Sequence, residues 1–124
     1  MLADLPLNWL SVALQVLVGG WMLVDGLRAL RTGAYKTPNS GDYAGRLGPW
    51  AGLLHRLGID PNSNLAKWAH VIVGLLWLAT ALGAVLGAAW YTSVAIAAAI
   101  LGLWYLPFGT LVSLLTLAIL YLMR

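Results

Sequence analysis

The chain carries no Asp, Glu, Lys or Arg over 56 consecutive residues, from Trp68 to Met123. Every charged residue lies at or before Lys67, except Arg124. Soluble domains draw about 25% of their residues from these four types, whereas only 9% of this chain is charged. This composition predicts an all-α integral membrane protein that forms a single membrane domain over residues 1–124.

The apolar segments are long enough for four transmembrane helices. One span needs about 20 residues, so the charge-free run divides at two turn-like segments, residues 87–92 and 105–109. Three spans with a final helix kinked at Pro107 would require a helix of roughly 50 Å over 90–123, well beyond the ~30 Å hydrocarbon core. The predicted spans are therefore about 8–30, 67–88, 90–105 and 107–123.

The basic residues predict the orientation of the spans. Six of the seven fall between the first and second apolar runs, so the positive-inside rule makes loop 31–66 cytoplasmic and leaves both termini on the other side. Within this loop, apolar residues recur at steps of three and four over about 47–58, which predicts a short amphipathic helix in the membrane interface. Its apolar stripe is Leu47, Trp50, Leu54 and Leu57.

Two ionisable residues inside the predicted spans are the candidates for chemistry. Asp25 is the one carboxylate in a span, where ionisable groups are costly; it either pairs with Arg28 or contacts another helix. His70 lies at a similar depth in the second span. Contact with Asp25 would hold its imidazole in one tautomer, as a proton relay or an axial ligand of a metal macrocycle requires. The alternative is a histidine bonded to a neighbouring helix or to interfacial water.

His70 also completes the pattern Ala-x-x-x-His over Ala66–His70. This pattern resembles bacterial light-harvesting antenna helices, whose histidine ligates bacteriochlorophyll. The resemblance covers five residues and implies a tetrapyrrole-binding role for His70. Antenna polypeptides have a single span with the histidine in its middle, and this chain departs from them in both respects.

No arrangement typical of an enzyme or a metal site is visible in the sequence. Serines and threonines are scattered through the spans, where they usually bond to their own helix backbone. His55 and His70 are 15 residues apart and the chain has no cysteine, which matches no metal-ligand spacing. A net charge of +3 is too small to indicate nucleic-acid binding. The sequence therefore predicts a non-enzymatic protein without a metal site, and it identifies no cofactor.

Small residues at four-residue intervals on the second span indicate close helix packing. Ala79, Gly83 and Gly87 form such a ridge, which lets a neighbouring backbone approach. The ridge serves either the interior of the bundle or a contact with another protein. The segment Trp104–Thr110 looks like turns of small bacterial membrane proteins, so a bacterial inner (plasma) membrane is the expected location.

These patterns favour an accessory or assembly subunit that packs in membrane lipid against itself, as a homo-oligomer, or against a larger membrane complex. One alternative is a subunit that binds a tetrapyrrole, bacteriochlorophyll or haem, through His70. Another is a small proton-coupled transporter or channel oligomer that uses the Asp25 and His70 pair.

Overall fold

The structure, a computed structural model, describes residues 6–33, 35, 47–105 and 108–123. These residues form five helices and no strand. The helices are α1 (Pro6–Thr32), α2 (Pro49–Arg56), α3 (Asn64–Leu86), α4 (Tyr91–Gly102) and α5 (Phe108–Met123). Residues 36–46 of the predicted cytoplasmic loop lie outside the described part of the chain.

Two of the helices are long and apolar enough to cross a membrane, over Trp9–Thr32 in α1 and Asn64–Leu86 in α3. Helix α4 has 12 residues and α5 has 16, so they measure about 18 and 24 Å, less than the ~30 Å core. Helix α4 ends before residue 105 because the backbone tightens there: the amide of Tyr105 bonds to the carbonyl of Gly102 at 3.1 Å. The expectation of four full-length spans is not confirmed.

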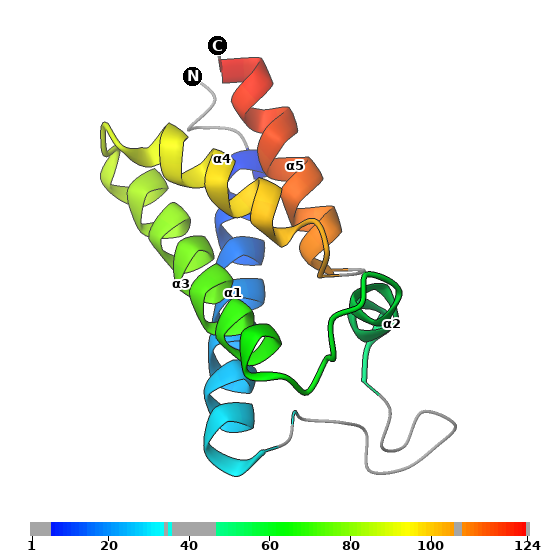
Figure 1. Ribbon diagram of the computed structural model, residues 1–124. Coiled ribbons are helices and arrows are strands. Elements are labelled where there is room, and N and C mark those ends of the chain that lie inside the picture. Colours follow the sequence, from blue (N-terminus) through cyan, green and yellow to red (C-terminus); the bar gives the residue numbers. More distant parts are fainter. Residues whose placement is uncertain (1–5, 34, 36–46, 106–107, 124) are drawn as a thin grey trace.

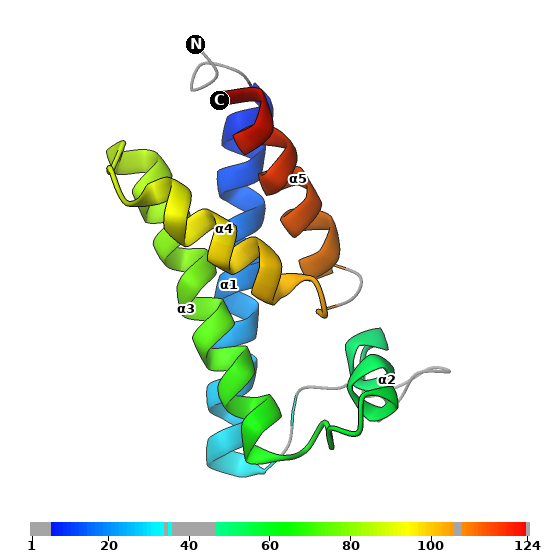
Figure 2. The same ribbon diagram turned by 45° about the horizontal axis from the view of Figure 1, so that its top comes forward.

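The helices pack as one pair and one hairpin. Helices α1 and α3 are antiparallel neighbours and share the most extensive contact, while α4 packs on α3 and α5 packs on both α4 and α1. The turn between α4 and α5 lies beside the middle of the α1–α3 pair, and α2 sits between this turn and the end where α1 stops (Figures 1 and 2). The four apolar helices therefore enclose one interior, which α2 approaches from one end.

Local sequence signals account for most helix ends. Gly48 precedes Pro49 at the start of α2, where proline loses no intrahelical hydrogen bond. The hydroxyl of Ser63 accepts a hydrogen bond from the amide of Ala66 at 3.2 Å and so caps α3. Gly87 ends α3 in the left-handed conformation, with φ of +63°, which glycine adopts without strain.

Polar side chains face inward and large apolar side chains face outward. Five polar residues are at most 1% exposed: Gln15, His70, Thr80, Ser113 and Thr116. Many large apolar side chains are more than half exposed, among them Leu17, Val24, Leu65, Ile72, Leu82, Leu86, Leu111, Leu114 and Leu122. A water-soluble helical domain would instead carry polar and charged side chains at most of these exposed positions.

Candidate functional site

His70 lies between α2 and the residues that follow α4. It is in the second turn of α3 and is 0% exposed. Its ring nitrogen Nδ1 lies 2.8 Å from the backbone carbonyl oxygen of Ala66. A carbonyl only accepts hydrogen bonds, so Nδ1 carries the proton and donates, and Nε2 keeps a free lone pair.

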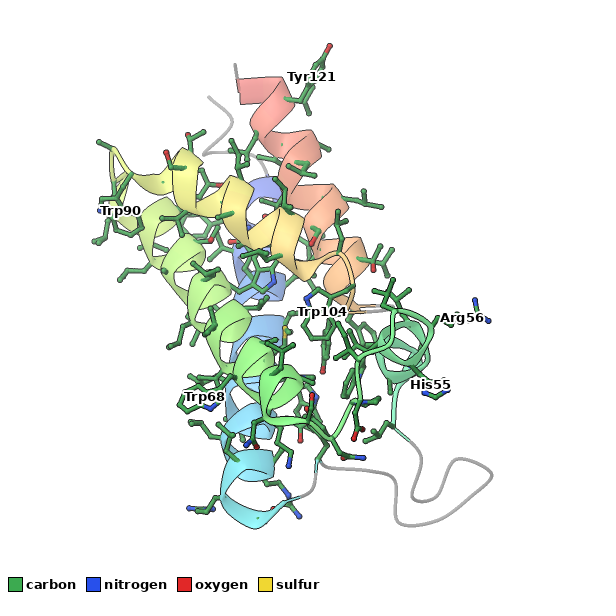
Figure 3. The ribbon with its side chains drawn as sticks, in the orientation of Figure 1. His55, Arg56, Trp68, Trp90, Trp104 and Tyr121 are labelled. Carbon is green, nitrogen blue, oxygen red and sulfur yellow. The ribbon has the colours of Figure 1, made fainter. Side chains whose placement is uncertain are left out.

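Four aromatic rings surround the imidazole. The distances between ring centroids are 4.4 Å from His70 to Trp50, 4.8 Å to Tyr35, 5.2 Å to Trp104 and 5.3 Å to Tyr105. These rings come from three separate parts of the chain: the segment after α1, helix α2, and the α4–α5 turn. Figure 3 shows Trp104 where that turn meets α2. We call His70 and these four rings the aromatic cluster.

Asp25 reaches the same region from α1. It is 5% exposed, and its charge acts on His70, Tyr35 and Tyr105. The next residue, Gly26, lets α1 approach closely, since a Cβ atom there would lie 2.9 Å from the Cβ of His70. Asp25 therefore lies on the side of α1 that faces His70 and the aromatic cluster. Arg28 is exposed on the surface instead.

The cluster leaves two buried polar atoms without a hydrogen bond among the described residues: Nε2 of His70 and the hydroxyl of Tyr35. Burial raises the pKa of the Tyr35 phenol above its ordinary value of 10.0, and the negative charge of Asp25 raises it further. Tyr35 is therefore a neutral hydrogen-bond donor. The aromatic cluster and Asp25 together hold an unused acceptor, an unused donor and a carboxylate, which are the groups needed to hold or pass a proton.

A second polar cluster lies farther up the bundle, between α1 and α5. The side-chain amide of Gln15 donates to Ser11 Oγ and to Thr116 Oγ1, both at 3.0 Å. Nearby, Trp77 Nε1 and Ser113 Oγ have no partner among the described residues. Gln15 is not among the site residues predicted from the sequence. Its spacing of four residues from Ser11, on one face of an apolar helix, was the available signal.

Bulky side chains separate the two polar clusters. Met22 lies between Gln15 and Asp25 along α1, and Trp77 lies seven residues beyond His70 along α3. Both side chains are 0% exposed. Both belong to the hydrophobic core.

The predicted stripe on α2 divides between two environments. Trp50 and Leu54 are 5% and 7% exposed and belong to the core, and Leu47 is partly buried against that core. Leu57, by contrast, is 64% exposed. The apolar side of α2 therefore packs mainly on the protein, which leaves Leu57 to face the surroundings.

The predicted ridge on α3 also divides. A Cβ atom on Gly83 would lie 2.8 Å from the indole ring of Trp90, so this position packs within the chain. Ala79 is partly buried. Gly87 ends the helix, and a Cβ atom there would meet nothing within 4 Å.

The part of the chain that the structure describes has no group of three His, Cys, Asp or Glu side chains able to hold a metal ion. Comparisons of the sequence with protein-family models and with curated proteins, and of the fold with solved structures, find no match.

Proposed function

We propose that the chain is a non-enzymatic integral membrane protein, an accessory or assembly subunit, with all four apolar helices in the bilayer. The observation that carries this proposal is the outward display of large apolar side chains around an interior that also contains buried polar residues. In water, such a surface would present extended apolar patches, which soluble monomers avoid. In a bilayer, the lipid acyl chains cover this apolar surface. Close packing of small and polar residues inside then holds the helices together.

The lengths of the helices favour a particular topology. Helices α1 and α3 cross the bilayer fully, and the α4–α5 hairpin enters from the side of residue 90 and returns to it. This arrangement keeps the α4–α5 turn at the depth of His70, in line with its ring contacts to Trp104 and Tyr105. Basic residues in the first loop make that loop cytoplasmic in the bacterial inner membrane proposed here.

Cysteine labelling tests this topology, since the natural chain has no cysteine. A membrane-impermeant reagent should label His55→Cys only from the cytoplasmic side and Trp90→Cys only from the other side. Phe108→Cys, 65% exposed on the protein surface, should remain unlabelled from both sides because it lies in hydrocarbon. Labelling of Phe108→Cys from the cytoplasmic side would instead support four full spans. Labelling of His55→Cys from the opposite side would reverse the orientation.

The filled interior favours a packing role over a transport role. The bulky side chains of Met22 and Trp77 are fully buried in this interior, so contacts with other proteins are the simplest use of this unit. Photo-reactive residues at Leu17, Leu75 and Leu114, on the outer faces of α1, α3 and α5, test this idea in native membranes. At least one should give a protein adduct of defined mass, and buried Met22 should give none. Adducts with lipid alone at all three positions would exclude the subunit role.

A second candidate function is a proton-coupled transporter or channel oligomer. It is favoured by the free acceptor on His70 beside the neutral Tyr35 hydroxyl and the Asp25 carboxylate. In vesicles that hold a pH-sensitive dye, the protein should dissipate a proton gradient, and Asp25→Asn should abolish the flux. Flux no faster than in empty vesicles excludes this candidate.

The free Nε2 of His70 is also the atom that would ligate the metal of a tetrapyrrole. A macrocycle at that atom requires the four surrounding rings to move aside, because their centroids lie within 5.3 Å of the imidazole. Absorption of protein isolated from its native membrane tests this candidate. A Soret-type band that is lost in His70→Leu supports it, and a colourless protein excludes it.

A further inference from the structure

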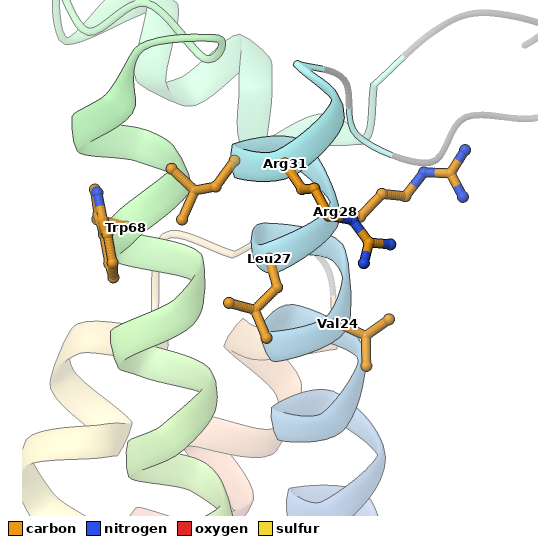
Figure 4. Close-up of a pocket in the computed structure, with 6 residues that line it drawn as sticks. Val24, Leu27, Arg28, Arg31 and Trp68 are labelled. Atoms are coloured by element: carbon orange, nitrogen blue, oxygen red, sulfur yellow. The ribbon is translucent and has the colours of Figure 1, made fainter.

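A groove on the outside of the molecule differs from the rest of the apolar surface by its charge. It lies where the last turns of α1 pass the first turns of α3, and it has a volume of about 710 Å³ (Figure 4). Ligand pockets in proteins commonly measure about 300 to 1,000 Å³, so this groove can receive part of a lipid. It is lined by Val24, Leu27, Arg28, Leu30, Arg31 and Trp68.

The groove combines an apolar floor with two positive charges at one end. Val24 is 63% exposed and Leu27 is 48% exposed, so both offer apolar surface to a hydrocarbon chain. Trp68 is 52% exposed on α3, and tryptophan favours the depth of the lipid headgroups. Arg28 and Arg31, one turn apart on α1, are exposed, and Figure 4 shows their guanidinium groups on the side of α1 that faces away from Trp68.

Among the residues that the structure describes, no acidic side chain lines the groove. Asp25, the nearest carboxylate along α1, is buried on the side of α1 that faces the aromatic cluster. The arginine charges are therefore available to a ligand, and the planar guanidinium binds a phosphate through two parallel hydrogen bonds.

The spacing of these residues fits the depth profile of a phospholipid. From Arg31 to Val24 the helix descends seven residues, or about 10 Å. That distance separates the phosphate layer from the upper part of the acyl chains. The charged end of the groove lies toward the end of α1, at the predicted cytoplasmic boundary, and the apolar end lies deeper.

We propose that this groove is a binding site for an anionic phospholipid of the cytoplasmic leaflet. Arg28 and Arg31 hold the phosphate, an acyl chain runs along Val24 and Leu27, and Trp68 borders the groove on its α3 side. The site rests on the proposed membrane location. Each arginine contributes about a fivefold preference for an anionic over a zwitterionic lipid.

Native mass spectrometry of the full chain in mild detergent tests the proposal. Phosphatidylglycerol and phosphatidylcholine with identical acyl chains are titrated separately. Wild-type protein should retain phosphatidylglycerol more strongly, and the double variant Arg28→Gln/Arg31→Gln should lose that preference. Arg56→Gln, which removes one exposed charge from α2, is the matched control and should keep it. Trp68→Ala should weaken the retention of both lipids.

Two results would overturn the site. Equal retention of the two lipids by wild-type protein means an unselective lipid shell. If Arg56→Gln reduces the preference for phosphatidylglycerol as much as the double variant does, the preference comes from general attraction between opposite charges. Circular dichroism must show the same helical content in every variant. Insertion into phosphatidylcholine vesicles, measured by resistance to alkaline extraction, separates the two proposals: insertion without lipid preference removes the groove alone, and failure to insert removes the membrane function itself.

Discussion

Gly19 of α1 and Gly74 of α3 bring the two helix backbones into direct contact. A Cβ atom on Gly19 would lie 2.9 Å from the carbonyl oxygen of Gly74, and a Cβ atom on Gly74 would lie 2.7 Å from that of Gly19. Seven residues along α1, Gly26 repeats the contact against His70. This seam sets the distance between α1 and α3, and so places Asp25 beside the aromatic cluster.

Gly74→Ala should destabilise the protein by about 1–3 kcal/mol, the usual cost of overpacking. The added methyl group would meet backbone atoms of Gly19 and Leu23, which cannot rotate away. Thermal unfolding in detergent, followed by helical content, measures the loss. The control is Gly20→Ala, where a Cβ atom meets nothing within 4 Å, and it should be neutral or slightly stabilising. Equal effects of the two changes would mean that the seam does not hold the helices together.

Trp50→Ala should detach α2 from the end of the bundle. The indole is 5% exposed and its ring centroid lies 4.4 Å from that of His70, so truncation removes an extensive contact of this helix with the core. Limited proteolysis should cleave faster near Gly48 and Gly58. Leu57→Ala, at a position that is 64% exposed, should leave the cleavage rate unchanged. Unchanged cleavage in Trp50→Ala would show that other contacts anchor α2.

Gln15 and Thr116 should be energetically coupled, because the hydrogen bond between their side chains joins α1 to α5. A double-mutant cycle with Gln15→Leu and Thr116→Val should give a coupling of about 0.6 kcal/mol, with about 1.7 kcal/mol as the upper end seen between membrane helices. The control is a second cycle that combines Gln15→Leu with Thr92→Val, at an exposed site on α4. A cycle that is additive at Thr116 contradicts the contact.

Tyr35→Phe should make the protein more resistant to high pH. Burial raises the pKa of Tyr35 in the folded state, so the stability from its neutral phenol is complete below the unfolded pKa of 10.0 and is lost as pH rises above it. The wild type should lose stability on going from pH 9 to pH 11, roughly across that value, and the variant should lose less. Tyr121→Phe, at a position that is 62% exposed, is the control. Equal losses in wild type and Tyr35→Phe would contradict the burial of a neutral phenol.

The sequence by itself determined the helical character of the chain and most positions where helices begin and end. In lipid, the backbone N–H and C=O groups of a charge-free run can form hydrogen bonds only within regular secondary structure. The residues that interrupt the helices are local signals, which the sequence displays directly. Pro49 after Gly48, and Gly87 at the end of α3, act through their own backbone preferences. Asp25 and His70 stood out for a similar reason, because an ionisable residue in an apolar segment is visible without any knowledge of its neighbours.

Only the tertiary structure decided which surfaces meet. Helical periodicity shows which residues share a face, but it does not show which helix covers that face. The ridge at Ala79, Gly83 and Gly87 was therefore visible in the sequence, yet the closest approach of α1 to α3 uses Gly19 and Gly74 instead.

The aromatic cluster also lay beyond the sequence. Tyr35, Trp50 and Trp104 are separated by long stretches of chain, and each on its own is typical of an aromatic residue at a membrane surface. They surround His70 because the α4–α5 hairpin turns back beside the middle of the α1–α3 pair and α2 closes the remaining end. That turn depends on where α4 packs on α3, a long-range contact that no local pattern encodes.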